Sequence, residues 1–306
     1  MTLMQSKANN PIPLKTIVGM PAYNEEKYVG SLVLQVRQYA DEVIVVDDGS
    51  TDRTHKVAKL AGATVIHHEK NEGYGAAIQK LLVEARKRNA DVLVILDADA
   101  QHNPEEIPSF IEAISGGFDV VIGSRTLERG SIPAYRRTGQ KVLTGLMQVL
   151  TNSKLSDTEC GFRAYSKRAL AQLEPKEKGM AISAEIVAEA FAKNLKVGEV
   201  PISAIYTGDG STLNPVKHGW GVFNRIMVMF SERRPLLFFG LAGVVCILGG
   251  IVAGVLVVQT LFASSVLNVG TALIAMLLVT IGILSIFTGI ILSVLVRRLG
   301  NLGPRR

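Results

Sequence analysis

The sequence predicts an α/β domain with a mainly parallel, doubly wound sheet, followed by two apolar helices that cross a membrane. Three observations support this prediction. Short β-rich runs alternate with helical patterns up to about residue 203. The strand runs are continuously apolar, as in sheets that are covered on both faces. From Leu236 to Val296 the chain has no acidic residue, lysine, arginine or histidine.

The elements of the α/β part follow one another regularly. The predicted strands cover residues 16–21, 42–47, 63–68, 92–97, 118–124 and 197–203. The predicted helices cover Glu25–Tyr39, Asp52–Ala61, Tyr74–Arg88, Pro104–Ile114, Lys141–Leu150 and Ile182–Asn194, and residues 126–140 and 206–221 are expected to be loops. Ligands of such sheets bind at the carboxyl ends of the strands, so we expect the chemistry there.

The apolar segment has room for two membrane spans, at about 236–262 and 267–296, since each span needs roughly 20 residues. Gly250 and Gly254 form a small-residue pair that would allow the helices to approach closely. Arginines flank only the outer ends, which predicts that both chain ends face the cytoplasm. The flanking arginines are Arg233, Arg234, Arg297 and Arg298.

The remaining parts of the chain are short. Residues 1–14 are a polar tail without the apolar run of a signal peptide, so the domain at 15–214 is expected to stay in the cytosol. Residues 215–235 are expected to form an amphipathic helix at the membrane surface, with an ordinary helix packed on the domain as the alternative. Residues 299–306 form a basic tail.

The charge distribution argues against a nucleic-acid partner, and the cysteine content argues against a disulfide. The net charge is +6, but all 27 acidic residues precede Leu236, and the domain before it is close to neutral. The excess of positive charge partly flanks the apolar segment, so it does not indicate a nucleic-acid partner. Cys160 and Cys246 fall in regions of opposite character, and no disulfide is expected.

Two aspartate pairs follow predicted strands. In "VVDDGSTD", residues 45–52, Asp47 and Asp48 point to opposite sides if the strand continues, so one can hold the structure while the other meets a base or ribose. In "LDADAQH", Asp97 and Asp99 fall on one side if the chain is extended. Two carboxylates this close repel each other, and this raises the pKa of one of them unless a cation lies between them.

A divalent metal ion is the natural cation for the second pair. Mg²⁺ or Mn²⁺ is commonly held by one or two carboxylates together with substrate phosphates. Gln101, two residues after Asp99, adds a neutral oxygen. The alternative is a solvated turn with helix capping near Asn103.

Other short motifs are compatible with structural roles. In "MPAYNEE", Pro21 can end a strand and Asn24 can cap a helix, whereas Tyr23 can cover a planar ligand. The glycines of "NEGYGAA", residues 71–77, fit either phosphate binding or close packing. His67 and His68 are interpreted as strand-end residues. The chain has no GxxxxGK[ST] phosphate loop and no HExxH motif.

The motifs "PAYNEE", "VVDDGSTD", "DADAQH", "IGSR" and "GFRAYS" occur in the order and spacing of the family-2 inverting glycosyltransferases. Over about residues 15–220 the chain resembles the dolichol-phosphate mannose synthase group, which includes related polyprenyl-phosphate glucosyl and N-acetylhexosaminyl transferases. The resemblance implies a GT-A fold, a GDP- or UDP-linked sugar donor, a polyprenyl or dolichyl phosphate acceptor, and Mg²⁺ or Mn²⁺.

The resemblance also implies roles for single residues. The nucleotide sugar would contact Pro21, Tyr23, Glu25, Val46, Asp48, Asp97 and Ala98. The metal ligands would be Asp97, Asp99 and Gln101, the acceptor phosphate would meet Arg125, Arg136 and Gln140, and the catalytic residues would be Asp99, Arg125 and Arg136. Gln140 replaces a usual serine. Thr207 and Thr212 or Leu213 replace usual cations, with Lys217 and His218 as substitutes, which leaves the sugar and base open.

We therefore expect a membrane enzyme with two spans and cytoplasmic termini that transfers a hexosyl group, with inversion, to a polyprenyl phosphate. The alternative is a membrane-anchored glycosyltransferase that acts on a glycan or protein. A binding protein without catalysis is disfavoured by the intact "DAD", and a processive synthase by the lack of Q-x-x-R-W, since Trp220 is the only tryptophan. Glu185 is expected either to contact sugar hydroxyls or to cap the sheet edge. An oligomer is compatible with the sequence.

Overall fold

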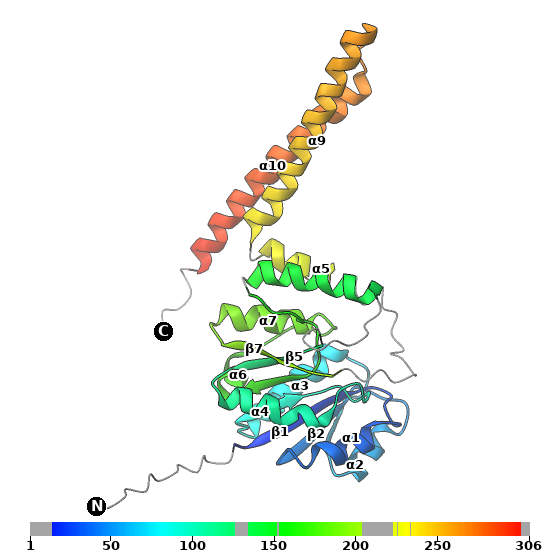
Figure 1. The fold of residues 1–306 in the computed structure, drawn as a ribbon, viewed down its shortest axis with the longest axis vertical. Helices are drawn as coiled ribbons and strands as arrows, with labels where there is room; N and C mark the ends of the chain where they lie inside the picture. Colours follow the sequence, from blue (N-terminus) through cyan, green and yellow to red (C-terminus); the bar gives the residue numbers. More distant parts are fainter. Residues whose placement is uncertain are drawn as a thin grey trace, which may run out of the picture. The chain divides into compact units, whose positions relative to one another are not determined.

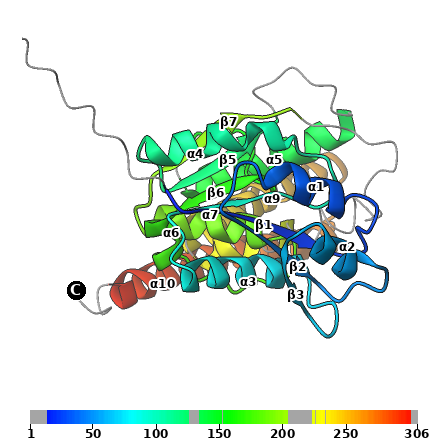
Figure 2. The ribbon, with the colours of Figure 1, turned by 90° about the horizontal axis from the view of Figure 1, so that it is seen from below.

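The computed structural model describes residues 14–125, 134–151, 153–203, 223–224, 226–232 and 234–300; the side chains of 134–142, 264 and 297–300 are not described. The chain divides into two compact units, Met1–Phe223 and Asn224–Arg306. Figures 1 and 2 show the first unit as a sheet with helices on both faces, and the second as paired helices.

The first unit contains a seven-stranded sheet with the order β3-β2-β1-β4-β6-β5-β7. The strands are β1 (Thr16–Ala22), β2 (Glu42–Asp47), β3 (Thr64–His67), β4 (Val92–Ile95), β5 (Val120–Ser124), β6 (Arg163–Ser166) and β7 (Val197–Pro201). Every pair is parallel except those of β6, which runs antiparallel to β4 and β5. The predicted sheet is confirmed, and β6 lies in a segment for which we predicted no strand.

Strand register brings the functional motifs to one edge. Ala22 at the end of β1 pairs with Asp47 at the end of β2, and Ile95 at the end of β4 pairs with Arg163 at the start of β6. Because β6 is antiparallel, the loop that leads into it reaches the same edge as the carboxyl ends of β1, β2 and β4. The chain before Arg163 therefore belongs to this edge.

The helices of the first unit are α1 (Val29–Val36), α2 (Thr54–Leu60), α3 (Tyr74–Lys87), α4 (Ile107–Ser115, after the short 3₁₀ turn η1 at Pro104–Glu106), α5 (Ala134–Thr151), α6 (Lys167–Gln172) and α7 (Ile182–Ala192). Figure 2 shows α3 and α4 on opposite sides of the sheet, α3 against β1 and β2 and α4 against β4 to β7. The central strands are buried, which explains their continuous apolar runs.

The largest differences from the predicted helices concern where α5 and α1 begin. Helix α5 begins at Ala134, so residues 134–140 are helical rather than a loop. The helix tolerates Gly139 in its interior, because a glycine there costs only about 1 kcal/mol. Helix α1 begins at Val29, so Asn24 does not cap it; Asn24 has a left-handed backbone (φ 56°), and its side chain accepts from the Thr51 amide at 2.9 Å.

The second unit contains α9 (Pro235–Ser264) and α10 (Val269–Gly300), both long and apolar enough to cross a membrane. The helices approach through glycines, because a Cβ on Gly243 or Gly282 would lie 2.6 Å from the other's carbonyl oxygen. Gly250 packs against Ala275 and Val279, whereas Gly254 has open space. The predicted close approach at Gly250 and Gly254 is therefore confirmed for Gly250 and wrong for Gly254. The second glycine at the contact is instead Gly243, seven residues before Gly250, which is the spacing of paired helices.

The segment before α9 is helical in its described residues, 223–224 and 226–232. Ile226 and Met229 are buried, and the Phe230 and Phe238 rings lie 6.3 Å apart. The amphipathic pattern thus has an apolar side, and its place at a membrane surface remains a prediction.

Candidate active site

Asp97 and Asp99 lie in a tight turn after β4, not in an extended continuation of the strand. Ala100 has a left-handed backbone (φ 60°), and the Gln101 amide donates to Asp99 Oδ1 at 3.0 Å. The expected reason for their common side, an extended chain, is therefore wrong. The turn itself keeps both carboxylates half-buried at the edge of the sheet.

Three carboxylates influence one another at this edge. Burial raises the pKa of Asp99, and the nearby Asp97 charge raises it further. Burial also raises the pKa of Asp97, although the Tyr74 hydroxyl, which donates to Oδ1 at 3.1 Å, opposes this shift. The pKa of Glu25, from the loop after β1, is raised to about 7, first by burial and then by Asp99. This edge of the sheet therefore brings three carboxylates together where they are partly shielded from solvent.

This donor set fits a hard divalent cation. Mg²⁺ and Mn²⁺ prefer oxygen ligands, and Asp97, Asp99 and the half-buried Gln101 side chain all offer oxygen. A cation would also relieve the repulsion that raises the pKa of Asp99. The role of each residue as a metal ligand stays a prediction.

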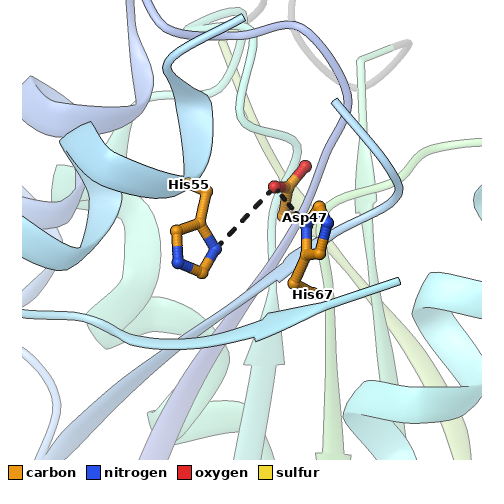
Figure 3. A group of neighbouring side chains, drawn as sticks. All are labelled: Asp47, His55 and His67. Atoms are coloured by element: carbon orange, nitrogen blue, oxygen red, sulfur yellow. Dashed lines mark hydrogen bonds and ion pairs between the residues drawn. The ribbon is translucent and has the colours of Figure 1, made fainter. Parts of the chain in front are cut away.

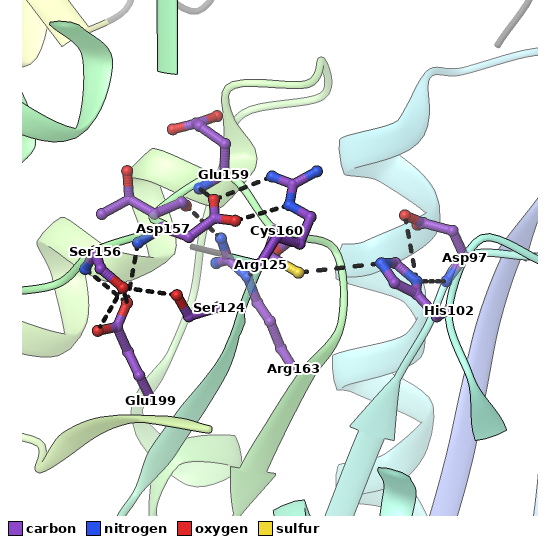
Figure 4. Close-up of polar contacts among 11 residues, drawn as sticks. Asp97, His102, Ser124, Arg125, Ser156, Asp157, Glu159, Cys160, Arg163 and Glu199 are labelled. Carbon is purple, nitrogen blue, oxygen red and sulfur yellow. Dashed lines mark hydrogen bonds and ion pairs between the residues drawn. The ribbon is translucent and has the colours of Figure 1, made fainter. Parts of the chain in front are cut away.

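A second loop, residues 156–162, holds the guanidinium group of Arg125 near the carboxylates. Arg125, just after β5, donates from Nε to Asp157 Oδ2 at 2.7 Å and from Nη2 to Asp157 Oδ1 at 3.0 Å. Asp157 is buried, and Glu199 of β7 accepts from the amides of Ser156 (2.7 Å) and Asp157 (3.0 Å). Figure 4 shows these contacts as one network. Arg125 is thereby held in a fixed orientation.

The same loop is fastened to the aspartate turn. Gly161 lies so close to the Asp97 carboxylate that a Cβ there would collide with it. Buried Arg163 donates to three carbonyl oxygens, those of Thr158 (2.6 Å), Cys160 (2.7 Å) and Ser183 (3.0 Å). The two loops therefore form one rigid wall of the site.

His102, after the aspartate turn, and Cys160, in the second loop, face each other but lack the protonation states of a nucleophilic pair. Their Nε2 and Sγ atoms are 4.0 Å apart. Burial lowers the pKa of His102 to about 4 and raises the pKa of the Cys160 thiol to about 12. The imidazole is neutral and the thiol protonated at neutral pH, so we assign both a packing role.

The predicted nucleoside residues surround the ends of β1 and β2. Pro21 pairs in register with Val46, both buried, and Tyr23 is 46% exposed. Asp48 is buried, and its carboxylate meets His68 Nδ1 (2.7 Å) and the amides of residues 72 (2.9 Å) and 73 (2.8 Å). Asp48 therefore shapes the loop after β3. Ala98 is buried in the aspartate turn.

Close packing explains the glycines of "NEGYGAA". A Cβ on Gly73 or Gly75 would collide with the backbone at Glu177 and Lys178, and the Gly75 amide donates to the Lys178 carbonyl at 2.8 Å. Glu185 holds the same loop, because it accepts from the amides of Lys176 (3.1 Å) and Glu177 (2.7 Å). The contacts of Gly73 and Gly75 favour close packing as the role of these glycines. Glu185 fastens the loop at residues 176–177 rather than capping the sheet edge, and its contact with sugar hydroxyls stays a prediction.

Some predicted residues lie outside this picture. Arg136 and Gln140 are in α5, but their side chains are not among those described. Thr207, Thr212, Leu213, Lys217 and His218 lie outside the described residues. Conversely, we did not single out Tyr74, Asp157, Arg163 or Glu199. The polar residues of "SDTECGFRAYS" and the lone acid in the strand "VGEVP" were the signals available for three of them.

Comparison with known proteins identifies similar chains over most of the first unit. Residues 17–174, just over half of the chain, match the family described as Glycosyl transferase family 2. The UDP-N-acetylglucosamine–dolichyl-phosphate N-acetylglucosaminyltransferase of Methanococcus voltae is 33% identical, over 69% of this chain and 94% of the relative. The dolichyl-phosphate hexose transferase of Haloferax volcanii is 32% identical, over 71% of this chain and 94% of the relative.

Solved structures agree in fold. Glucosyl-3-phosphoglycerate synthase of Mycobacterium tuberculosis, in complex with Mn²⁺, UDP and glucosyl-3-phosphoglycerate, superposes with a TM-score of 0.58 at 21% identity, covering 72% of this chain and 80% of the other. This likeness confirms the expected GT-A fold of the first unit. Together with the family match, it shows that the chain is a glycosyltransferase that belongs to glycosyl transferase family 2.

Proposed function

We propose that this protein transfers a hexosyl group from a nucleoside diphosphate sugar to a polyprenyl or dolichyl phosphate, with inversion at the anomeric carbon. The observation that carries the proposal is the meeting of Glu25, Asp97 and Asp99 at one sheet edge, with Arg125 held nearby by Asp157. The relatives from Methanococcus voltae and Haloferax volcanii, named for transfer to dolichyl phosphate, support this acceptor class.

The carboxylate side of the site serves the donor. Tyr23, Glu25 and Asp48 line the region where the nucleoside would lie, with Pro21, Val46, Asp97 and Ala98 around it. Asp97, Asp99 and Gln101 would hold Mg²⁺ or Mn²⁺, which supplies positive charge to the diphosphate leaving group when it is bound. Asp48 also accepts from the amides of residues 72 and 73, so it fixes the loop after β3.

The acceptor supplies its own nucleophile. A phosphate monoester of a lipid is anionic at neutral pH, so no side chain has to remove a proton from it. Arg125 orients this phosphate, with Arg136 and Gln140 of α5 as further contacts, and arginine suits bidentate phosphate binding. Asp157 sets the plane of the Arg125 guanidinium in advance, so less conformational entropy is lost when the acceptor binds.

The transfer step exchanges one bond for another. An oxygen of the lipid phosphate forms a bond to the anomeric carbon from the face opposite the diphosphate. The bond from that carbon to the diphosphate oxygen breaks, and its electron pair leaves with the nucleoside diphosphate. Attack from the opposite face inverts the anomeric configuration.

The apolar helices fit a lipid substrate. We propose that α9 and α10 form the spans expected at 236–262 and 267–296, with the catalytic domain (15–214) and both termini in the cytoplasm and residues 215–235 at the membrane surface. The arginines that flank only the outer ends support this orientation. A water-soluble probe that modifies cysteines introduced at the turn, near Asn268, would test it from each side of sealed vesicles.

The activity is tested with the full chain in lipid nanodiscs. Labelled UDP- and GDP-sugars are offered with Mn²⁺ or Mg²⁺ and with either a polyprenyl phosphate or the matching polyprenol. We expect a labelled glycolipid only with the phosphate, and an inverted anomeric configuration in its NMR spectrum. Transfer to a soluble glycan or protein, with no labelled lipid, would contradict the proposal and favour the alternative acceptor.

A further inference from the structure

A second, separate group of metal-type ligands lies at the ends of β2 and β3. Asp47 is the last residue of β2, His67 is the last residue of β3, and His55 lies in the first turn of α2. One ligand atom from each lies within 4.8 Å of the other two. The group shares no residue with Asp97, Asp99 and Gln101, and the proposed transfer reaction does not use it.

Both imidazoles are aimed at one carboxylate oxygen. His67 Nδ1 is 2.9 Å from Asp47 Oδ2, and His55 Nδ1 is 4.0 Å from the same atom. The two rings meet edge to face, with their centroids 5.4 Å apart. Figure 3 shows the rings on either side of the Asp47 carboxylate. Strand pairing fixes part of this arrangement, because Asp47 and His67 are partners in the β2–β3 register.

The burial of Asp47 calls for a positive partner. Its side chain is 0% exposed, and the Ser50 amide donates to the other oxygen, Oδ1, at 3.0 Å. Within the described ranges no lysine or arginine forms an ion pair with Asp47. A buried carboxylate without a cation is costly, so a positive charge between Oδ2 and the two rings would stabilise it.

His55 supplies an independent sign of a missing partner. Its Nδ1 atom is buried and has no hydrogen-bond partner among the described residues. The rest of the ring is open, since the side chains of His55 and His67 are 41% and 44% exposed. A metal ion could therefore reach the group from solvent, with water completing its coordination.

We propose that Asp47, His55 and His67 bind a first-row transition-metal dication of the Zn²⁺ type. Two imidazoles and one carboxylate suit Zn²⁺, Co²⁺ or Ni²⁺ rather than Mg²⁺, and three protein ligands with an open fourth position are a common zinc arrangement. The ion ties β2, β3 and α2 together. Asp48, which follows Asp47, fixes the loop at residues 72 and 73, so the ion stiffens this end of the domain.

The test measures Zn²⁺ and Co²⁺ binding to the full chain, purified without a histidine tag and stripped with a chelator. Because these ions can also bind the carboxylates near Asp99, every measurement uses the Asp99→Asn background. We expect one equivalent of Zn²⁺, a visible Co²⁺ spectrum of low-coordinate type, and a higher unfolding temperature with Zn²⁺. Loss of a mere outer-shell partner costs about 10–100-fold in affinity, so loss of a ligand should cost at least about 100-fold.

Two ligand variants and one control decide the outcome. His55→Ala and His67→Ala should each lose the tight equivalent and the Co²⁺ spectrum while they remain folded without metal. Lys56→Ala, next to His55 on the same helix, should keep both. Unchanged Zn²⁺ affinity in both histidine variants would overturn the proposal, and so would the absence of a tight equivalent in the Asp99→Asn background. Sugar transfer is not a readout, so failure of the proposed function does not affect this test.

Discussion

Two aspartate pairs follow strands of the same sheet, but their surroundings differ. At the end of β2, Asp47 and Asp48 are both buried. Internal donors reach both oxygens of Asp48, from His68 and two loop amides, whereas Asp47 receives the Ser50 amide on Oδ1 and faces the two imidazoles of the proposed metal site with Oδ2. After β4, Asp97 and Asp99 are half-buried and have fewer donors, and their pKa values are raised. A carboxylate whose oxygens accept hydrogen bonds from the protein itself stabilises the fold. Carboxylates that lie close together with few such donors are typical of a site that binds a cation or substrate.

The largest effect is expected when the crowded pair loses one charge. Asp99→Asn should lower kcat for transfer to the lipid phosphate by roughly 1,000-fold, because the charge that balances the diphosphate in the transition state is no longer held in place. The unfolding temperature should stay unchanged or rise, since the variant removes a repulsion. Asp91→Asn, before the other end of β4, is the matched control and should remain active. Activity of Asp99→Asn near that of the wild type would contradict a functional role for the aspartate pair after β4.

Asp48, whose two oxygens both accept internal hydrogen bonds, should respond in stability. Asp48→Ala leaves His68 and two amides in the loop after β3 without their acceptor, which should lower the free energy of unfolding by about 3 kcal/mol. Thermal unfolding of the full chain measures the shift, with Asp99→Ala as the opposite case. Equal unfolding temperatures for the two variants would mean that the contrast between the pairs is not real.

A smaller effect is expected where the loop before β6 touches the crowded pair. Gly161→Ala places a Cβ against the Asp97 carboxylate, and the displaced carboxylate should lower kcat by roughly 10- to 100-fold. Gly145→Ala in α5 is the control, because nothing lies within 4 Å of a Cβ there, and it should keep full activity. An active Gly161→Ala enzyme would show that Asp97 tolerates movement and has no positioned role.

The smallest effect concerns an acid outside both pairs. Ion pairs with Arg88 and Lys87 lower the pKa of Glu84 in α3 from 4.5 to about 2. A lowered pKa in the folded state stabilises the protein above the unfolded pKa, and this contribution disappears as pH falls from about 4.5 to 2. Because solvent screens such pairs, Glu84→Gln should cost about 1 kcal/mol at pH 6.

Denaturant unfolding at pH 6 and at pH 3 checks this prediction, with Glu112→Gln on α4 as the control. The difference between Glu84→Gln and the wild type should shrink at the lower pH. A difference that grows toward pH 3 would have the wrong sign for a lowered pKa.

The sequence predicted the fold well because the controlling signals are local. Apolar runs ended by "VVDD" and "LDADAQH" located strands β2 and β4, and the apolar segment after residue 235 located both long helices. Strand β6, helix α6 and the start of α5 were missed. Strand β6 and helix α6 are short, β6 is antiparallel, and Gly139 is typical of a loop although it lies inside a helix.

The site was only partly predictable for a different reason. Asp97 and Asp99 were found from their spacing, although a turn rather than an extended chain brings them together. The contacts of Arg125 with Asp157, and of Ser156 and Asp157 with Glu199, join residues that are 32 to 43 positions apart. No local pattern encodes such pairs, since sheet order decides which strand ends meet.

Mn²⁺-dependent nucleotide binding tests the central contrast most directly. UDP and GDP are titrated calorimetrically into the nanodisc-embedded wild type, Asp99→Asn and Asp91→Asn, each with and without Mn²⁺. We expect wild type and Asp91→Asn to bind one nucleotide more tightly with Mn²⁺, and Asp99→Asn to lose that gain while it remains folded. Mn²⁺-dependent binding of equal strength in Asp99→Asn would contradict the assignment of the crowded pair to the donor.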